Sequence, residues 1–144
     1  MSPINLVLNI LWFLFGGLWM ALSWAIAGLI MALTIVGLPW TRAAFTLALY
    51  TLAPFGRTVV RRDLIEGHET LDTGPLGTIG NIVWLLLAGW WLAVEHLLIA
   101  LPFAVTIIGL PIAWAHLKLA GLSLWPVGMT VVSNEQTPRY PPPL

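Results

Sequence analysis

The sequence contains very few charged residues and no cysteine. Of its 144 residues, 8% are charged and 59% are hydrophobic, and the mean hydropathy is +0.92. Soluble domains carry roughly a quarter charged residues, so this chain lacks the polar side chains that a water-exposed globule needs. We therefore expect an all-α integral membrane protein.

These absences also exclude several functions. Without cysteine there is no disulfide, thiolate metal site or cysteine nucleophile. The six basic and six acidic residues give a net charge of zero, so no basic face is available for nucleic acid. The sequence has no nucleophile–base pattern and no phosphate-binding glycine loop. We expect no enzyme activity, no cofactor and no nucleic-acid partner.

The chain is an internal repeat. Shifting the sequence by 72 positions aligns Asn, Trp, Gly and Pro residues without a gap, which a simple bias toward Leu and Ala would not produce. The best-matched pairs of segments are 9–12 with 81–84, 34–39 with 106–111, and 58–60 with 130–132. The chain is therefore predicted to contain two copies of one structural unit.

The predicted organisation is a single membrane domain over residues 1–133. Its repeats span about 5–60 and 77–132, a cytoplasmic connector covers 61–76, and a flexible tail covers 134–144. Each repeat has a long apolar segment, a Gly-Leu-Pro break and a shorter apolar segment. The β-branched pairs that follow predict a short β-ribbon on the cytoplasmic side.

The Gly-Leu-Pro break predicts that one helix ends and another begins. Gly37 and Gly109 end the first helices, and Pro39 and Pro111 suit the first turn of the next. The first helix, from about residue 4 to 33, is longer than a span needs, and Gly16-Gly17 is its expected bend. The shorter segments hold only about 15 residues, against about 20 for a full span.

Two topologies follow from these lengths. The favoured one is a helical hairpin in each repeat, hence four membrane segments. The alternative is one true span per repeat, with the shorter helix at the interface. The segment 57–80 around the connector holds Arg57, Arg61 and Arg62, which places the connector in the cytoplasm by the positive-inside rule. Its acidic residues and the glycines of residues 74–80 predict a solvated loop and a flexible entry to the next helix.

These motifs resemble the YccF family of bacterial inner membrane proteins. The second repeat carries the closest match, in IIGLP at 107–111, KLA at 118–120 and LWPVG at 124–128. The segment GWWL at 89–92, followed by His96, is similar to the same pattern. The resemblance implies two copies of the family's domain, a multi-pass location in the bacterial inner membrane and a cytoplasmic C-terminus.

Ionisable residues inside membrane segments are the first candidates for function. Glu95 and Lys118 lie at similar depths on either side of the hairpin turn, so they are expected to pair. The pair would be either an ion or proton site or a structural ion pair. His96, His116 and Arg42 complete this set. Arg42, His96 and Lys118 match the family pattern, whereas Glu95 and His116 depart from it. Metal-ligand spacing is absent, so no metal is expected.

A polar stripe follows one face of each long helix at steps of three and four residues. Its members are Asn9, Trp12, Trp19 and Ser23 in the first repeat, and Asn81, Trp84, Trp91 and Glu95 in the second. The stripe would either line a pathway or pack helices together through interhelical hydrogen bonds.

Two functions are consistent with this sequence. The first is an oligomeric channel or small-solute or ion transport subunit, because one copy has too few helices to enclose a pore and would form a homo-oligomer. The alternative is a non-transporting membrane protein that packs with lipid or partner proteins.

Overall fold

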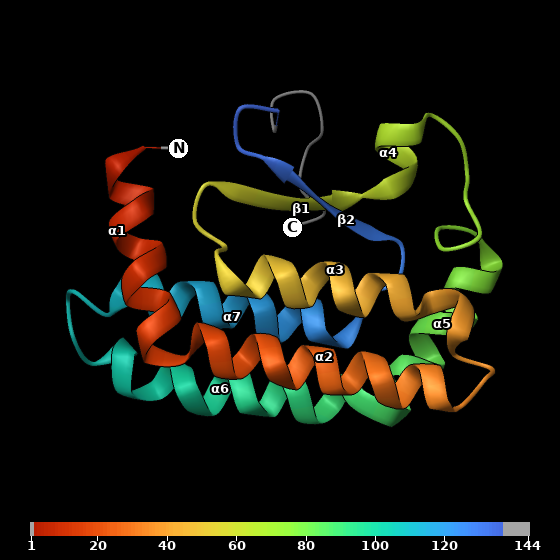
Figure 1. Cartoon of the computed structure of the whole chain (residues 1–144), viewed down its shortest axis with the longest axis horizontal. Helices are drawn as coiled ribbons and strands as arrows, with labels where there is room; N and C mark the ends of the chain where they lie inside the picture. The colour runs from red at the N-terminus through yellow and green to blue at the C-terminus, as the bar shows by residue number, and fades with distance from the viewer. Residues whose placement is uncertain (1, 137–144) are drawn as a thin grey trace.

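The computed structural model describes residues 2–136 and shows a mostly helical chain with one small ribbon (Figure 1). The predicted tail therefore lies mostly outside the described residues. In chain order the elements are α1 (Pro3–Trp12), η1 (Phe13–Gly17), α2 (Leu18–Leu33), η2 (Leu38–Trp40), α3 (Thr41–Leu52), β1 (Arg57–Arg61), α4 (Arg62–Glu66), α5 (Pro75–Trp84), η3 (Leu85–Gly89), α6 (Trp90–Ala104), α7 (Leu110–Leu124) and β2 (Met129–Ser133).

Each repeat has the same course through space. A first helix descends from the ribbon side, and the chain then bends into a second helix at the bottom of Figure 1. A tight turn leads into a third helix, which packs back between the second helix and the ribbon. The hairpins α2–α3 and α6–α7 run side by side in opposite directions, so the predicted tandem repeat is confirmed.

The predicted bend at Gly16-Gly17 is confirmed. The chain makes a π-helical turn at η1, where Gly16 has φ 148°, a conformation that L side chains rarely adopt. In the second repeat a π-helical turn, η3, occupies the equivalent position. Two continuous stretches, Pro3–Leu33 and Pro75–Ala104, are long and apolar enough to cross a membrane by length and composition. Each contains one of these turns.

The Gly-Leu-Pro breaks are also confirmed, but the glycines do not end the first helices. Those helices end at Leu33 and Ala104, and each glycine is the N-cap of the next helix. A threonine in each turn binds its glycine. The Gly37 N–H donates to Thr34 Oγ1 at 3.1 Å, and the Gly109 N–H donates to Thr106 Oγ1 at 3.0 Å. The same hydroxyls donate to the Met31 and Phe103 carbonyls, which the ending helices leave without an intrahelical donor. The proline two positions after each glycine lies in the first turn of η2 or α7.

The connector is more ordered than the sequence predicts. It contains the short helix α4, and α5 begins at Pro75, so the prediction of a flexible entry over residues 74–80 is wrong. Gly74 is the N-cap and Pro75 takes the first helical position, where proline is favoured. At Gly77 an added Cβ would collide with the Asp72 carbonyl. Close packing of the connector against α5 therefore requires this glycine.

The predicted ribbon is confirmed, and its register defines the symmetry of the fold. Strands β1 and β2 are antiparallel, with Val59 opposite Val131. These two residues are equivalent in the repeats, because they lie 72 positions apart. A residue that pairs with its own repeat equivalent lies on a two-fold axis. The ribbon also places both strands on the same side of the molecule.

The main core joins the two repeats. Trp24 of α2 stacks on Trp84 of α5, with ring centroids 5.5 Å apart and an interplanar angle of 22°. Both rings are fully buried, and small residues of α3 such as Ala44 pack beside them. Because these two large side chains are buried against each other, the two repeats share one hydrophobic core.

Candidate functional site

A column of polar side chains follows the two-fold axis between the repeats. Two contacts in it join residues that are repeat equivalents, namely Ser23 with Glu95 and Trp24 with His96. Both pairs are 72 residues apart in sequence. Together with Val59 and Val131 of the ribbon, they trace the axis through the whole molecule, from the ribbon to the opposite face.

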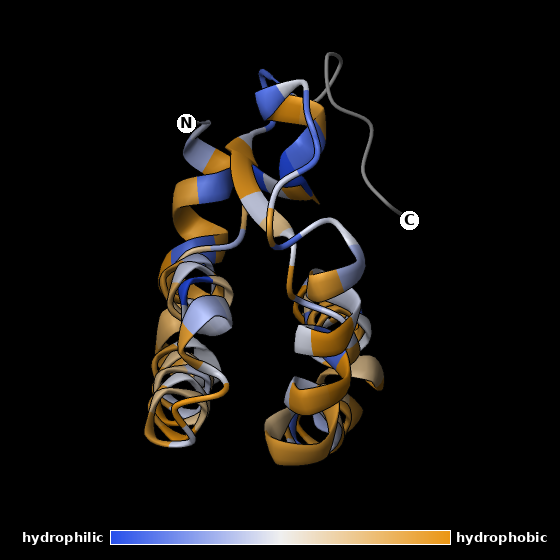
Figure 2. Cartoon of the chain, turned by 90° about the vertical axis from the view of Figure 1, so that its right-hand side faces the viewer, coloured by the Kyte–Doolittle hydropathy of each residue, from blue (hydrophilic) through white to orange (hydrophobic). Residues whose placement is uncertain are grey.

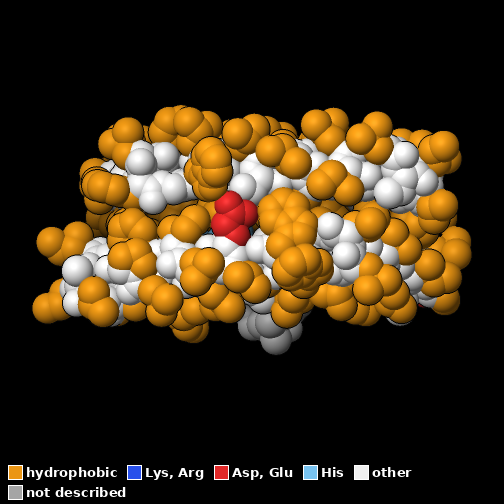
Figure 3. Space-filling view, turned by 90° about the horizontal axis from the view of Figure 1, so that it is seen from below, with side chains coloured by type: hydrophobic (Ala, Val, Ile, Leu, Met, Phe, Trp, Pro, Cys, Tyr) orange, Lys and Arg blue, Asp and Glu red, His pale blue; other side chains and the backbone are white. Residues whose placement is uncertain are grey.

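The carboxylate of Glu95 lies at the far end of this column. Its Oε1 accepts a hydrogen bond from Trp19 Nε1 at 2.9 Å and another from Ser23 Oγ at 3.0 Å. Glu95 is half-buried. Figure 3 shows an acidic side chain in the middle of an otherwise apolar face. The two donors come from the first repeat, so the repeats meet at this carboxylate.

The structure does not bring Glu95 and Lys118 together. Lys118 is exposed, and its Nζ lies 5.7 Å from the ring centroid of Trp114 on the same helix. The depth argument placed both residues correctly along their helices but did not fix the rotation of α7. His116 faces inward, and a residue two positions later points about 200° away around the helix.

Two histidines, which the sequence did not predict to meet, form the buried part of the column. Trp24 Nε1 donates to His96 Nε2 at 3.1 Å, and His96 Nδ1 lies 3.0 Å from His116 Nδ1. An indole N–H is only a donor, so His96 Nε2 must be the acceptor. Neutral His96 then carries its proton on Nδ1 and donates it to His116. The hydrogen bonds therefore run from Trp24 through His96 to His116.

This order fixes the tautomer of His116. Because its Nδ1 accepts, neutral His116 carries its proton on Nε2, which is buried and has no hydrogen-bond partner among the described residues. The His116 ring packs on Trp12, with centroids 4.3 Å apart. A Cβ added at Gly16 would lie 3.9 Å from Nε2. The column thus ends at the bend between α1 and α2.

The asparagines of the polar stripe fasten the first helix of each repeat to its Pro-x-Gly turn. Asn9 Nδ2 donates to the Phe55 carbonyl, and the Phe55 N–H donates to Asn9 Oδ1, both at 3.0 Å. Asn81 makes the same two bonds with Val127, at 3.1 and 2.9 Å. Each amide therefore binds the donor and the acceptor of one residue where the chain leaves its last helix.

The stripe tryptophans one turn later make matching contacts. Trp12 Nε1 donates to the Thr51 carbonyl at 2.6 Å, and Trp84 Nε1 donates to the Ser123 carbonyl at 2.7 Å. Both carbonyls lie in the last turn of a helix, where no intrahelical donor is available. Trp91 Nε1 instead donates within its own helix segment, to Leu87 O at 3.1 Å. The stripe residues thus hold helices and turns together.

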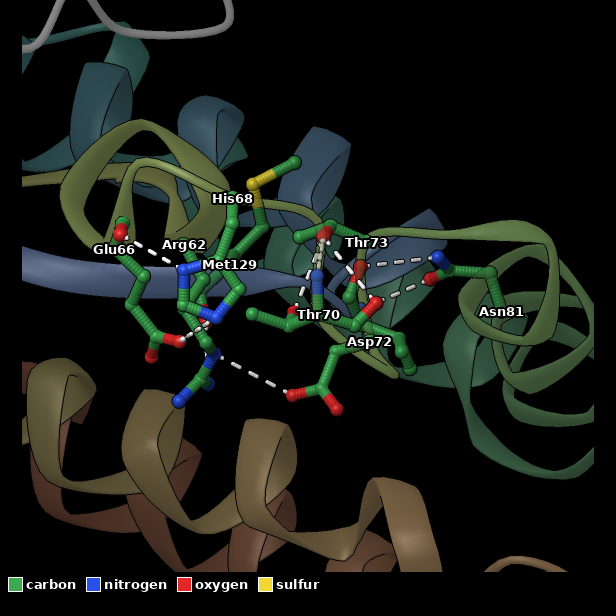
Figure 4. Close-up of polar contacts among 9 residues, drawn as sticks. Arg62, Glu66, His68, Thr70, Asp72, Thr73, Asn81 and Met129 are labelled. Carbon is green, nitrogen blue, oxygen red and sulfur yellow. Dashed lines mark hydrogen bonds and ion pairs between the residues drawn. The ribbon is translucent and has the colours of Figure 1, made fainter.

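The charged residues of the connector form a separate polar layer beside the ribbon (Figure 4). Arg62 is buried, its Nε lies 3.4 Å from Asp72 Oδ2, and its guanidinium donates to the Met129 carbonyl at 3.2 Å. Arg61 Nε donates to Asp63 Oδ1 at 3.1 Å. That hydrogen bond lowers the pKa of Asp63 and raises the pKa of Arg61. Arg62 therefore has a structural role, because it links the connector to β2, whereas Arg61 and Asp63 lie near the surface.

The remaining candidates lie apart from the column. Arg42 is exposed near the start of α3. Across the described residues, no three His, Asp or Glu side chains gather in a group that would hold a metal ion. The two imidazoles of the column can hold a proton or pass it from one to the other. Glu95 can accept a hydrogen bond at the apolar face. It contains no nucleophile–base pair.

A groove on the outside of the second hairpin is lined only by apolar side chains. It has a volume of about 450 Å³ between α6 and α7. Its lining residues are Val94, Leu97, Leu98, Ala100, Leu101, Ala104, Ala113 and Leu117. Such a groove has no polar group to orient a solute, and its chemistry suits a hydrocarbon chain.

The comparisons with known proteins agree with this architecture. The YccF family model, described as "Inner membrane component domain", matches the chain twice, at residues 7–57 and 79–129. Inner membrane protein YccF of Escherichia coli K12 is 39% identical over 132 residues, which cover 90% of this chain and 88% of that protein. The protein of the same name from Shigella flexneri matches to the same extent.

No solved structure matches the chain significantly. The two family matches coincide with the two structural repeats, and together they cover well over half of the sequence. The relatives share nearly the full length, including the connector. This chain belongs to the YccF family of inner membrane proteins.

Proposed function

We propose that the protein is a non-transporting structural component of the inner membrane that acts by binding lipid. The observation that carries this proposal is that the polar side chains of the helices face the interior of the protein. The two stripe asparagines bind backbone groups of their own repeat, as do Trp12 and Trp84. Trp24, His96 and His116 form a chain of hydrogen bonds in the interior. The outer surfaces of its hairpins, by contrast, are mostly apolar.

The groove between α6 and α7 supports lipid binding, because the two repeats differ there. In the first repeat Phe45 packs on Gly28, and a Cβ added at Gly28 would lie 3.2 Å from Phe45 Cζ. The equivalent residues of the second repeat are Leu117 and Ala100, which line the open groove. The smaller Leu117 leaves space that the phenylalanine fills in the first repeat. We assign an acyl chain of a membrane phospholipid to this space.

One observation favours the second candidate, an oligomeric transport subunit. Glu95 is a half-buried carboxylate on an apolar face, and an ionisable group at membrane depth usually faces protein or water. In an oligomer, neighbouring copies of α2 and α6 would surround a pathway that passes Glu95. Within one copy, however, Glu95 already accepts hydrogen bonds from Trp19 and Ser23 of the other repeat.

The two functions are separated by reconstitution. Purified protein in liposomes is expected to give no ion flux above protein-free vesicles. In nanodiscs, a phospholipid with a photoreactive acyl chain is expected to crosslink to the groove, mapped by mass spectrometry. Leu117→Phe should reduce these adducts several-fold, because it fills the groove as Phe45 does. Leu86→Phe, at an exposed position outside the groove, is the matched control.

Two results would contradict lipid binding as the function. One is an ion flux that Glu95→Gln abolishes, which would support the transport subunit. The other is an unchanged adduct pattern in Leu117→Phe, which would mean that the groove holds no lipid chain.

A further inference from the structure

The charged layer of the protein lies beside its helices and not at their ends. Residues 57–72 contain seven of the 12 charged residues of the chain. In Figure 1 the ribbon and α4 lie along the length of α3 and α7, on the side away from α2 and α6. Figure 2 shows the same separation, with hydrophilic residues gathered at the ribbon end and apolar residues below.

This arrangement restricts how the hairpin helices meet a bilayer. If α2, α3, α6 and α7 crossed the membrane along its normal, the ribbon and connector would lie at the depth of the hydrocarbon. Exposed charges such as Arg61 and Glu69 would then face lipid, which is costly for ionised groups. The membrane normal therefore has to run from the charged layer through the helices, perpendicular to their axes.

The hairpin turns support the same orientation. A turn that emerged on the far side of the membrane would meet water, yet both turns are apolar and exposed. Ile35 is 75% exposed in the first turn, and Ile107 and Ile108 are 87% and 82% exposed in the second. None of the residues from 34 to 39 or from 106 to 111 is charged. These turns are suited to hydrocarbon.

The lengths of the hairpin helices also favour an orientation in the plane of the membrane. The hairpin helices α2, α3, α6 and α7 have 16, 12, 15 and 15 residues. At 1.5 Å per residue they are roughly 18–24 Å long, shorter than the hydrocarbon core of about 30 Å. The bends after α1 and α5 turn the longer stretches out of a straight crossing.

We propose that the protein inserts into one leaflet only, with its two-fold axis along the membrane normal and its hairpins in the plane of the membrane. In this placement α2 and α6 lie deepest, and α3 and α7 lie between them and the headgroups. The helices α1 and α5 descend from the headgroup region. The inference deepens the lipid-binding function proposed above, because it names the lipid surface that the apolar face occupies.

The dimensions and charges fit a single leaflet. Packed helix axes lie about 8–10 Å apart, and each helix is about 10–12 Å across. The distance from the axes of α3 and α7 to the lower surface of α2 and α6 is therefore roughly 13–16 Å, close to half of a hydrocarbon core of about 30 Å. The exposed cations of the hairpins, Arg42 and Lys118, both belong to the upper helices α3 and α7. At that level they meet lipid phosphates. The deepest carboxylate, Glu95, is bound by its two donors from the first repeat.

The basic residues beside the connector indicate which of the two leaflets the protein occupies. Arg57 and Arg61 are exposed on the ribbon, and an excess of basic residues marks cytoplasmic segments. The cytoplasmic leaflet also carries anionic lipids that attract such residues. The occupant of the apolar face is therefore the hydrocarbon of the cytoplasmic leaflet.

The chain has no cysteine, so single cysteines can report its position in the native membrane. The probe is a membrane-impermeant maleimide, applied to spheroplasts and to inverted inner-membrane vesicles. Ile35→Cys and Ile107→Cys report the hairpin turns, and His68→Cys reports the exposed connector. His68→Cys is expected to react only in inverted vesicles. The turn cysteines are expected to react in neither preparation, and to react fully after detergent solubilisation.

Labelling of either turn in spheroplasts would overturn the proposal, because it would show a hairpin that crosses the membrane. Labelling of a turn in inverted vesicles would also overturn it, since the hairpin would then lie outside the hydrocarbon. Labelling of His68→Cys only in spheroplasts would overturn the assignment to the cytoplasmic leaflet. Ile108→Cys repeats the test if one variant fails to fold. The liposome flux above is measured separately, so a failure of the lipid-binding function remains distinguishable.

Discussion

The indole nitrogen of Trp24 lies 3.1 Å from Nε2 of His96, the residue at the same position of the other repeat. In a perfectly symmetric molecule two equivalent side chains on the axis would be identical and could not be donor and acceptor. The difference between the repeats therefore gives the hydrogen bond its direction. It also fixes the tautomers of both buried histidines.

Trp24→Phe is expected to destabilise the protein by about 1–3 kcal/mol, because it leaves the buried His96 Nε2 without its donor. Thermal unfolding in detergent micelles measures the loss. Trp91→Phe is the matched control, since Trp91 binds only a carbonyl of its own helix segment. Equal losses of stability in the two variants would show that the Trp24–His96 hydrogen bond contributes no more than one within a single helix.

Replacing Asn81 by Leu should cost about 2 kcal/mol or more, because it leaves both backbone groups of Val127 unpaired in a buried turn. Unfolding by denaturant in micelles is the measurement. Asn134→Leu removes an exposed hydrogen bond from Thr58 Oγ1 and should change stability by less than about 1 kcal/mol. If both substitutions are neutral, the amide does not hold the turn to α5.

Glu95→Gln and Glu95→Ala are expected to differ in stability. Glutamine retains the oxygen that accepts from Trp19 and Ser23, so its stability should stay close to that of the unchanged protein. Alanine leaves both donors unpaired and should cost about 1–2 kcal/mol. Thermal stability of both variants in nanodiscs tests this. A glutamine variant as unstable as the alanine variant would mean that the negative charge itself is required.

The Arg61–Asp63 pair predicts a small pH effect at the start of α4. Since the pKa of Asp63 is lowered in the folded protein, its contribution to stability is present above its ordinary value of 3.8 and is lost as the pH falls through the folded value. Both side chains are partly exposed, so the effect should stay below about 1 kcal/mol. Hydrogen-exchange protection of α4 should fall in acid, and Asp63→Asn should make it insensitive to pH. An unchanged acid response in that variant would assign the effect to another group.

A charge at a hairpin turn should be poorly tolerated. Ile107→Arg places a cation where we infer hydrocarbon, at a cost of up to about 2.5–3.5 kcal/mol, the range for an arginine at the centre of the bilayer. Leu71→Arg makes the same chemical change at an exposed position of the connector and should be nearly neutral. The yield of folded protein in the membrane fraction compares the two. Similar yields would argue that the turn lies in water.

Much of the fold could be predicted because glycine and proline act locally and because the repeat is visible in the sequence. The 72-residue shift exposed the repeat, Gly16-Gly17 marked the bend, and Gly-Leu-Pro marked the hairpin turns. The sequence does not predict the helical start at Pro75, because glycine usually indicates a flexible backbone. In the structure, Gly77 provides close contact with Asp72 instead.

The polar column was less predictable, because it depends on how helices of different repeats rotate against each other. Periodicity placed Glu95 and Lys118 at matching depths but left the rotation of α7 undefined. The meeting of His96 with Trp24 was nevertheless encoded in the repeat. Residues 72 positions apart meet wherever they lie on the two-fold axis, and Val59 with Val131 marks that axis at the ribbon.

The orientation of the helices is the most direct test of the account. Oriented circular dichroism of the purified protein in aligned bilayers distinguishes helices that lie in the membrane plane from helices that cross it. We predict the in-plane spectrum as the dominant signal, because α2, α3, α6 and α7 contain most of the helical residues, with a smaller transmembrane-like share from α1 and α5. A dominant signal from helices along the membrane normal would contradict insertion into a single leaflet.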